Sequence, residues 1–491
     1  MSDASPALAS AAGSVEHAAI LRILAGIMLA MFLGALDQTI VATALPTIGH
    51  DLGDFDNLPW VVTACLISST AVTPLYGKLS DIHGRRTMLL ASLALFVLGS
   101  VACALAPSML VLILARGLQG VGGGGLISLA QTVIADVVAP KERARYQGLI
   151  ASVFVASSVV GPVLGGVFAE KLHWSLIFWI NLPLGLVALR LTDRALRELP
   201  RHDRPHRLDL IGAALILATT ICFLLALSWG GGRYSWGSPQ LLALLGATVV
   251  LSLSFAVRLA TAHEPLLPIS VLREPVVALG TAAACFAMGT FIGLSIYVPV
   301  YFELARALTA AQSGFALIPL MCGVILGATT SARLMAKIRH YRRPPLAGLV
   351  LAMLGCLALA ARPSSLLMIG VEVLLMLVGI GVGTVLPVTT VAIQNAVPMH
   401  QLGTATGVMA FFRALGGAVA VAGFGALVLG DASRTASVTL VGEPDAVFTR
   451  LFITAAAGLL ASFAWLSLMP ERPLRSSMPE PNRPAAASGE A

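Results

Sequence analysis

Charged residues are scarce in this sequence. Only 11% of its 491 residues are Asp, Glu, Lys or Arg, whereas 57% are hydrophobic and the mean hydropathy is +0.89. An ordinary soluble domain has roughly 25% charged residues, so this composition excludes a soluble protein. The chain is therefore that of a polytopic membrane protein.

Cysteine is sparse too, and the six cysteines show no disulfide or metal-binding pattern. All of them fall inside long apolar stretches, without the close Cys or His spacing of a zinc site. The sequence also lacks a phosphate-binding glycine loop and a recognisable catalytic constellation. We therefore expect no metal, no cofactor, no enzymatic activity and no ATP-driven pumping by this chain alone.

The net charge of +7 gives no reason to expect a nucleic-acid partner. The basic residues are spread over many short segments between the apolar stretches, rather than gathered in one patch. Nearly all of them fall in one set of alternate segments, and basic loops stay on the cytoplasmic side of a membrane. Both termini are therefore predicted to be cytoplasmic.

The apolar stretches are near-continuous, and each is long enough to cross about 30 Å of hydrocarbon as a helix. Strands facing lipid would alternate instead. We predict an all-helical fold with fourteen transmembrane helices. The predicted spans are 21–45, 60–76, 88–106, 110–134, 148–168, 176–191, 210–229, 241–257, 276–302, 315–335, 346–361, 366–393, 404–428 and 451–468.

Polar segments between the spans divide the chain into regions. The predicted regions are a cytoplasmic N-terminal segment at 1–20, a six-helix group at 21–191, a basic linker at 192–209, two extra transmembrane helices at 210–257, a second six-helix group at 276–468 and a disordered cytoplasmic tail at 471–491.

Asp37 is a carboxylate inside the first apolar run. Counting inward from Pro46 at about 1.5 Å per helical residue places it about 14 Å below the outer surface, near the bilayer midplane. A carboxylate at that depth is costly in hydrocarbon, and such residues commonly serve function. We predict that Asp37 carries a transported proton, with a structural hydrogen-bonding role as the alternative.

The segment 77–86 is predicted to form the loop after the second span. Gly77 and Gly84 permit a tight turn between two helices. Asp81 can then pair with Arg85, Arg86 or a neighbouring helix end, giving a cytoplasmic latch that breaks and re-forms between conformations. A purely structural loop is the alternative.

Arg116 lies within the fourth span, where a cation needs a carboxylate, carbonyl groups or a cavity. We expect it to face the protein interior and to couple protonation to conformation as its distance from Asp37 changes. A fixed counter-ion is the alternative. The glycine run that follows, 122–125, allows close contact between helices.

The fifth span contains Gly161, Pro162, Gly165 and Gly166, which predict a bend and a smooth face. We expect the bend to act as a hinge between two rocking states. The segment 174–183, before and at the start of the sixth span, has the aromatic composition of an interfacial anchor, and we assign it no catalytic role.

Glu372, within the twelfth span, is a candidate second proton or cation site. A central cavity for substrate is expected to be lined by apolar and aromatic side chains from both halves, although each such residue can instead be plain packing. The candidate lining residues are Gln38, Thr39, Gln119, Met288, Phe291, Tyr297, Tyr301, Phe411, Phe412 and Arg413.

These motifs together resemble the major facilitator superfamily, in its fourteen-helix drug:proton antiporter branch, often called EmrB/QacA-like. The likeness covers nearly the whole chain. Segment 36–46 resembles the first-helix signature of the branch, 77–86 the loop motif of the superfamily, 116–124 the fourth-helix motif and 161–166 the fifth-helix motif associated with export by antiport. The sequence departs from the pattern at Ala42, usually asparagine, Cys65, commonly tyrosine, and Ser175, usually arginine.

The resemblance implies two six-helix bundles related by pseudo-symmetry, with the extra helix pair between them. It also implies a proton-coupled antiporter in the cell (inner) membrane that exports hydrophobic or cationic organic compounds by alternating access. Its partners would be the lipid bilayer, protons and small drug-like molecules, and a periplasmic adaptor is left open. The proton gradient would be its energy source, without any cofactor.

Two other functions are compatible with the same residues. One is a dedicated exporter of a single metabolite or of an antibiotic made by the same cell. The other belongs to a different class, a membrane sensor or assembly partner without transport, for which the basic residues from Arg190 to Arg207 would form a docking or lipid-binding surface.

Overall fold

The computed structural model describes residues 6–55, 57–197, 208–231, 233–338, 340–361, 363, 366–428 and 444–475. Much of the predicted basic linker (198–207), most of the predicted tail (476–491) and the first five residues lie outside these ranges. Within the described residues the regular structure is helical, apart from an isolated bridge between Gly230 and Tyr234. Fourteen stretches are long and apolar enough to cross a membrane, so the predicted fold class is confirmed.

Most helices follow one another with short connections, and the connections 197–209 and 429–443 are longer. The first half contains α1 (Pro6–Leu52), α2 (Trp60–His83), α3 (Arg85–Ala104), α4 (Met109–Val137), α5 (Pro140–Lys171), α6 (Leu176–Trp179) and α7 (Asn181–Leu196). The extra pair is α8 (Leu210–Trp229) and α9 (Pro239–Thr261). The second half contains α10 (Ile269–Arg273), α11 (Pro275–Arg306), α12 (Ala310–Ala316), α13 (Ile318–Lys337), α14 (Arg343–Ala361), α15 (Met368–Ala396), η1 (Met399–Gln401), α16 (Leu402–Val428) and α17 (Pro444–Leu468).

Two predicted spans are each built from two helical pieces. The sixth is divided between α6 and α7 at Ile180, and the tenth between α12 and α13 at Leu317. In both cases the second piece has a proline in its first turn, Pro183 or Pro319. Proline has no backbone N–H, so the carbonyl four residues earlier loses its helical partner and the helix is interrupted.

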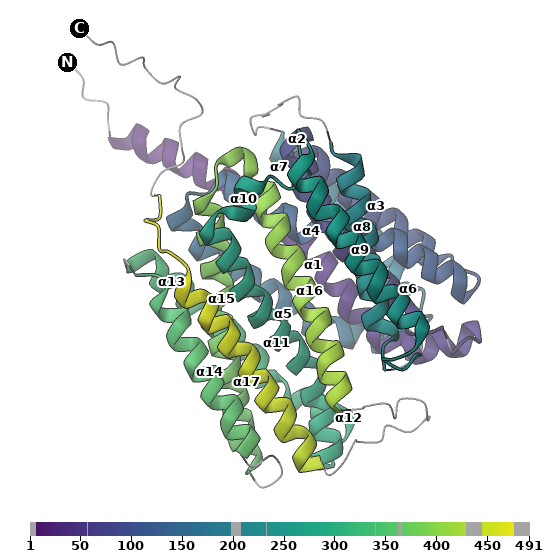
Figure 1. The fold of residues 1–491 in the computed structure, drawn as a ribbon. Helices are drawn as coiled ribbons and strands as arrows, with labels where there is room; N and C mark the ends of the chain where they lie inside the picture. Colours follow the sequence, from purple (N-terminus) through teal and green to yellow (C-terminus); the bar gives the residue numbers. More distant parts are fainter. Residues whose placement is uncertain are drawn as a thin grey trace, which may run out of the picture.

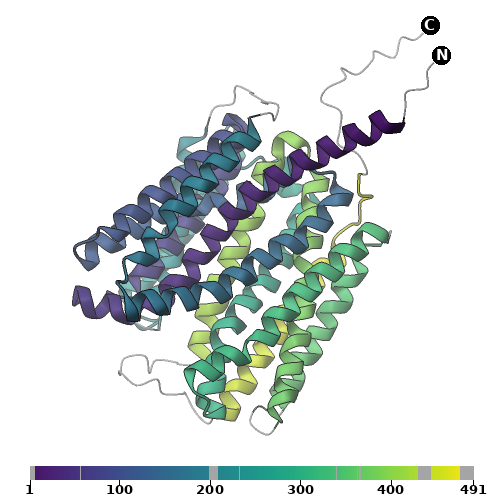
Figure 2. The ribbon, with the colours of Figure 1, turned by 180° about the vertical axis from the view of Figure 1, so that it is seen from behind.

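The two halves form separate bundles. In the first bundle α1 packs against α5 and α7, and α4 packs against α2 and α3; in the second, α15 lies against α13 and α14, and α11 against α16 and α17. Contacts between α2 and α16 and between α5 and α13 join the bundles. Figures 1 and 2 show the bundles close together at the end with α10 and splayed apart toward the end with α12.

We call the closed end the Asp81 face, since Asp81 lies there, where α2 and α4 end and α16 begins. Backbone approaches backbone at this face: a Cβ added to Gly77 would lie 2.5 Å from the Gly403 carbonyl oxygen. Gln394 of α15 donates to the Gln131 carbonyl of α4 at 3.3 Å. The structure is therefore a state in which the bundles meet at one face and separate toward the other.

The extra helix pair lies beside the seam between the bundles. α8 packs against α2, α9 and α16, while α9 packs chiefly on α8. Asp209 accepts a hydrogen bond from the Gly212 amide and pairs with Arg258 at 2.9 Å, which ties the two helices together. Burial raises the pKa of Asp209, but the hydrogen bonds from Arg258 and Gly212 hold it below its usual range.

The segment after α9 connects both bundles at the Asp81 face. Leu266 and Leu267 are buried in a cluster that includes Leu75 of α2 and Val408 of α16. Because these two helices belong to different bundles, the segment contributes apolar burial to the closed face. The extra pair thus lies outside the two bundles, where it contacts both of them, and it does not form a layer between them.

Replacement of Leu266 with Ala should lower the thermal unfolding temperature of the purified protein. The side chain is fully buried, and truncation of a buried leucine costs about 2–5 kcal/mol. Leu253→Ala on α9 is the matched control, because Leu253 is 62% exposed. The unfolding temperatures would be followed by tryptophan fluorescence. Equal values for the two variants would show that burial of Leu266 does not stabilise the protein.

Candidate functional site

Asp37 lies midway along the 22–52 part of α1, and it is 1% exposed. α1 does not end near Pro46, as the predicted span assumed, but continues to Leu52. A proline is tolerated inside a membrane-spanning helix when neighbouring groups satisfy the freed carbonyl. The depth of Asp37 is therefore given by its place at the middle of a longer helix, and not by its distance from Pro46.

Three side chains from two other helices hold the Asp37 carboxylate. Arg116 Nη1 lies 2.7 Å from Asp37 Oδ2, and Gln119 Nε2 donates to Oδ1 at 2.8 Å. Residues three apart lie on the same face of a helix, so both point from α4 toward α1. Asn181 Nδ2 approaches Oδ1 more weakly, at 3.5 Å, from the start of α7. The predicted facing of Arg116 toward a carboxylate is found in the structure.

Arg116 Nε and Nη1 have further acceptors besides Asp37. Its Nε donates to the Val61 carbonyl at 2.9 Å, and Nη1 reaches Gln119 Oε1 at 2.6 Å. Its guanidinium lies over the Phe178 ring, 5.7 Å from the ring centre. Arg116 and Asp37 are therefore a buried pair of opposite charges that further hydrogen bonds support, and such bonds offset part of the cost of burying an ion pair.

Two members of this network were not found from the sequence. Ser100 of α3 accepts hydrogen bonds from Gln119 at 2.6 Å and from Asn181 at 3.1 Å. Asn181 and Phe178 belong to the segment that was interpreted as an interfacial anchor, so that interpretation is corrected: the segment also supplies the buried wall around Asp37 and Arg116. The available signal was an amide side chain at the start of an apolar span.

Glycines of α5 bring that helix close to α1 beside Asp37. A Cβ on Gly161 or Gly165 would collide with Thr39 or Thr43 of α1, whereas Gly166 faces open space. Thr39 Oγ1 donates to the Ser157 carbonyl of α5 at 3.0 Å. The predicted smooth face is therefore present. α5 is a single helix with Pro162 inside it, and the hinge function stays a prediction.

At the Asp81 face, segment 77–86 is mostly helical and is not the predicted loop. Gly77 and Asp81 lie in the last turns of α2, Gly84 alone makes the turn with φ of 85°, and Arg85 begins α3. A positive φ is readily available only to glycine. Gly77 serves a different purpose from the predicted turn, because its missing side chain lets α2 touch α16.

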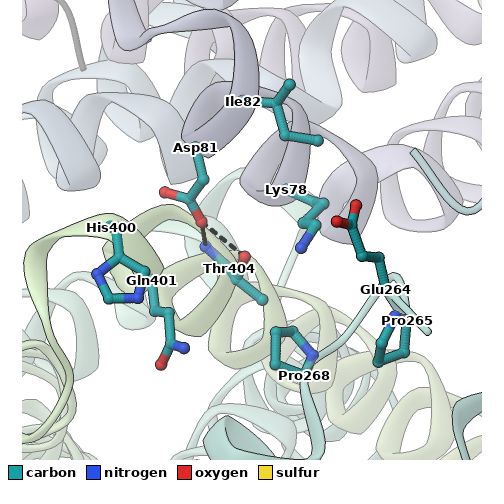
Figure 3. Close-up of a pocket in the computed structure, with 9 residues that line it drawn as sticks. All are labelled: Lys78, Asp81, Ile82, Glu264, Pro265, Pro268, His400, Gln401 and Thr404. Atoms are coloured by element: carbon teal, nitrogen blue, oxygen red, sulfur yellow. Dashed lines mark hydrogen bonds between the residues drawn. The ribbon is translucent and has the colours of Figure 1, made fainter. Parts of the chain in front are cut away.

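Asp81 is the polar link to the second bundle. Its Oδ2 accepts from the Thr404 amide at 2.7 Å and from the Thr404 hydroxyl at 2.6 Å, and its Oδ1 accepts from the Gly403 amide at 3.0 Å. These amides form the N-terminus of α16, where the helix dipole favours a negative charge. Figure 3 shows Asp81 directed at Thr404 beside a pocket of about 320 Å³ that Lys78 and Glu264 also line.

The arginines of this motif anchor Asp81 within the first bundle. Arg85 pairs with Asp81 at 2.5 Å and with Asp136 of α4 at 2.8 Å. Arg86 pairs with Asp193 of α7 at 2.5 Å. The predicted pairing of Asp81 with Arg85 and with a neighbouring helix end is thus found, while Arg86 has a different partner.

Several predicted cavity residues lie in the protein core. Gln119 is fully buried in the Asp37 network, and Tyr301 is fully buried among Phe302, Phe448 and Phe452. The Tyr301 hydroxyl donates to the Pro363 carbonyl. These two residues therefore do not line a cavity in this structure, because hydrogen bonding and aromatic packing hold them in the interior.

The remaining cavity candidates are divided between core and accessible positions. Tyr297 packs against Phe424, and Phe411 is 8% exposed, whereas Phe412 is 37% exposed. The half-buried or exposed candidates are Gln38, Thr39, Met288, Phe291 and Arg413.

Glu372 is half-buried in the second bundle, four residues after α15 begins at Met368. None of the contacts described for Asp37 and Arg116 involves Glu372, so the structure does not bring the three predicted proton-coupling residues together. Its role as a second proton or cation site stays a prediction.

Comparisons with known proteins agree with this architecture. A family model described as the Major Facilitator Superfamily matches residues 27–421. The chain is 32% identical over 406 residues to "Multidrug transporter protein MdtP" of Bacillus subtilis (strain 168), covering 83% of this chain and 75% of the relative. It is 32% identical over 409 residues to "Efflux pump FUS6" of Gibberella fujikuroi, covering 80% and 72%.

A solved structure shows the same fold at lower sequence similarity. The crystal structure of the human organic anion transporter MFSD10 (TETRAN) matches with a TM-score of 0.62 at 19% identity, covering 89% of this chain and 99% of that one. At this identity the match supports the arrangement of helices alone.

Thermal unfolding can test the Asp37–Arg116 pair as a unit. Removing one partner of a buried pair typically costs about 3–5 kcal/mol, because the other charge is left unpaired. Arg116→Met should therefore lower the unfolding temperature more than the double variant Asp37→Asn, Arg116→Met. Strictly additive losses would contradict direct coupling between the two side chains.

Loss of the Asp81 charge should loosen the closed face. Spin labels on His83 of α2 and Lys337 of α13, both exposed, would report the distance between the bundles in a cysteine-free background. Asp81→Asn should shift the distance distribution to longer values, because the charged contact with the start of α16 is lost. Asp193→Asn is the control, since Asp193 pairs with Arg86 and Arg197 inside one bundle. An unchanged distribution for Asp81→Asn would contradict the latch.

Proposed function

The chain belongs to the Major Facilitator Superfamily, and we propose that it is a proton-coupled antiporter that exports hydrophobic organic compounds, including cationic ones, by alternating access. Membership of this family makes it a membrane transporter and not an enzyme, as expected from the sequence. The names of its relatives, a multidrug transporter and an efflux pump, support export of organic compounds.

The buried Asp37–Arg116 pair carries the proposal of proton coupling. A proton on Asp37 would remove the negative charge that now faces Arg116 at 2.7 Å. The guanidinium would then be a buried cation without a counter-charge, a state that favours rearrangement of the helices that hold it. Protonation is thereby linked to conformation through a single contact.

Asn181 supports a second arrangement of this site. Its Oδ1 is enclosed and has no donor among the described residues. A carboxylate can only accept hydrogen bonds, whereas a protonated carboxyl also donates one. A half-turn of the Asn181 amide would place this oxygen toward Asp37 and give the proton an acceptor, so the network has a partner ready for the protonated form.

Alternating access is supported by the difference between the two ends of the molecule. The Asp81 face is closed by the α2–α16 contact, while the bundles lean apart at the other end. With both termini in the cytoplasm, the Asp81 face would be the inner one in the cell membrane. We infer that this conformation releases substrate outward and takes up a proton, and that breaking the Asp81 contacts opens the inner side.

Transport by purified protein in liposomes tests the proposed function. An inward proton gradient would be imposed, and efflux of three hydrophobic dyes (cationic, neutral and anionic) would be followed for wild type and Asp37→Asn. We expect gradient-driven efflux of at least one dye by wild type and efflux at the level of protein-free liposomes for Asp37→Asn, because the carrier carboxylate is lost. Asp51→Asn is the control, since Asp51 is on the same helix and 52% exposed.

Retention of gradient-driven efflux by Asp37→Asn would contradict the assigned role of Asp37. If folded wild-type protein moves none of the dyes, broad export is contradicted, and a dedicated exporter or a sensor becomes the better account.

A further inference from the structure

Arg413 is a second arginine within a membrane-spanning helix, and among the described residues it has no acidic partner, unlike Arg116. It lies near the middle of α16 (Leu402–Val428). In the described ranges the nearest groups that bind it are neutral: Nη2 donates to the Leu386 carbonyl at 3.3 Å and to the Thr389 and Thr390 hydroxyls at 3.0 and 2.9 Å, all on α15. A charge in this position is expensive without a counter-charge.

The remaining N–H groups of Arg413 are unused. Nε is fully enclosed and has no acceptor, and Nη1 has none either within the described part of the chain. Nη1, unlike Nε, is not enclosed by protein atoms. The three neutral acceptors on α15 hold one nitrogen, so the guanidinium is fixed in place while its positive charge and its Nη1 end stay available.

Arg413 lies on the side of the closed face where the bundles separate. Thr406 lies seven residues earlier on α16 and therefore on nearly the same side of the helix, about 10 Å closer to the Asp81 face. Gln394 donates to the Thr406 hydroxyl and to the Gln131 carbonyl of the first bundle, both at 3.3 Å. Thr406 thus belongs to the layer in which the bundles meet, and Arg413 lies two turns beyond it, toward the end where they separate.

Of the side chains next to Arg413 on these two helices, Thr389 and Thr390 are polar and buried, whereas Leu386 and Phe412 are apolar and at least partly accessible. Phe412 is 37% exposed, and Leu386 of α15 and Arg413 itself are half-buried. Arg413 thus places a guanidinium beside apolar side chains, just beyond the layer in which the bundles meet. Such a combination suits an amphipathic ligand with one charged group.

The contacts of Arg413 indicate the sign of that group. Asp37 and Arg116 neutralise one another in the first bundle, whereas the described contacts of Arg413 are all neutral. Glu372, the carboxylate within α15, lies fourteen residues before Leu386 and so about 21 Å away along that helix. We propose that Arg413 binds a carboxylate of the transported compound, so that the substrates are amphipathic organic acids or zwitterions. Guanidinium groups bind carboxylates through strong, charge-assisted hydrogen bonds. This inference rests on the proposed function and narrows its substrate range.

A purely structural role for Arg413 makes different predictions. If the side chain only braced α15 through Leu386, Thr389 and Thr390, an uncharged donor of similar reach would serve, and the charge of the ligand would be irrelevant. Arg413→Gln tests this, because it removes the charge. Its shorter side chain also weakens the contacts with α15, but a loss of bracing alone would affect the acid and the amide equally. Arg413→Lys keeps the charge and loses the fork of donors.

The test compares dansylaminoundecanoic acid with its primary amide, which has the same apolar body without the negative charge. Efflux from proteoliposomes under an inward proton gradient would give KM and kcat for each compound. For wild type we expect a kcat/KM at least tenfold higher for the acid. Arg413→Gln should raise KM for the acid about tenfold and leave values for the amide within twofold, and Arg413→Lys should recover part of the preference.

In the transport assay, two results would overturn the proposal: equal transport of acid and amide by wild type, or equal losses for both compounds in Arg413→Gln. Binding is measured in parallel as the ligand-induced rise in unfolding temperature, which needs no proton gradient. If wild type moves neither compound but binds the acid in an Arg413-dependent way, the proposed function fails and the Arg413 site stands. If neither compound is moved or bound, the Arg413 site is rejected.

Discussion

The buried pair between Asp37 and Arg116 is the interaction on which the first bundle depends. Two opposite charges inside a membrane protein are tolerable only while they face one another and their other hydrogen-bonding groups are occupied. Gln119, Ser100 and Asn181 meet that condition, and they come from α4, α3 and α7. With the contact between Arg116 and the Val61 carbonyl of α2, the pair connects five helices, α1, α2, α3, α4 and α7, and any change in its charge acts on the arrangement of all five.

Much of this site could be predicted from the sequence, because a charge in an apolar run is a strong signal. Asp37 and Arg116 were identified in that way, and their contact is present. Ser100 and Asn181 could not be assigned, since polar residues of this size occur in many helices and only tertiary packing decides which of them meet a carboxylate. The same limit applies to Tyr301, whose aromatic ring suits a cavity or a core equally well until its neighbours are known.

In the fold, too, some features follow from the local sequence and others depend on tertiary contacts. Hydrophobic length sets the membrane spans, but it does not show that α2 continues to His83 or that α1 passes Pro46. Helical hydrogen bonding continues wherever neighbouring helices supply contacts, so the ends of the apolar runs were not the ends of the helices. Gly77 illustrates this, because its place in a helix–helix contact depends on Gly403, which is more than 300 residues away in the sequence.

The two membrane-embedded arginines, one in each bundle, have different partners and different proposed roles. Arg116 has a carboxylate of its own and is suited to respond to a proton, whereas Arg413 has neutral partners and is suited to respond to a ligand. The Asp81 contact lies at the closed face, and it connects the bundles that contain the two arginines. Infrared difference spectroscopy of the protein in membranes, with and without bound substrate, would report whether Asp37 is protonated. We expect a protonated-carboxyl band that disappears on substrate binding in wild type and is missing in Asp37→Asn. The same band in Asp37→Asn would contradict the proton-carrying role of Asp37.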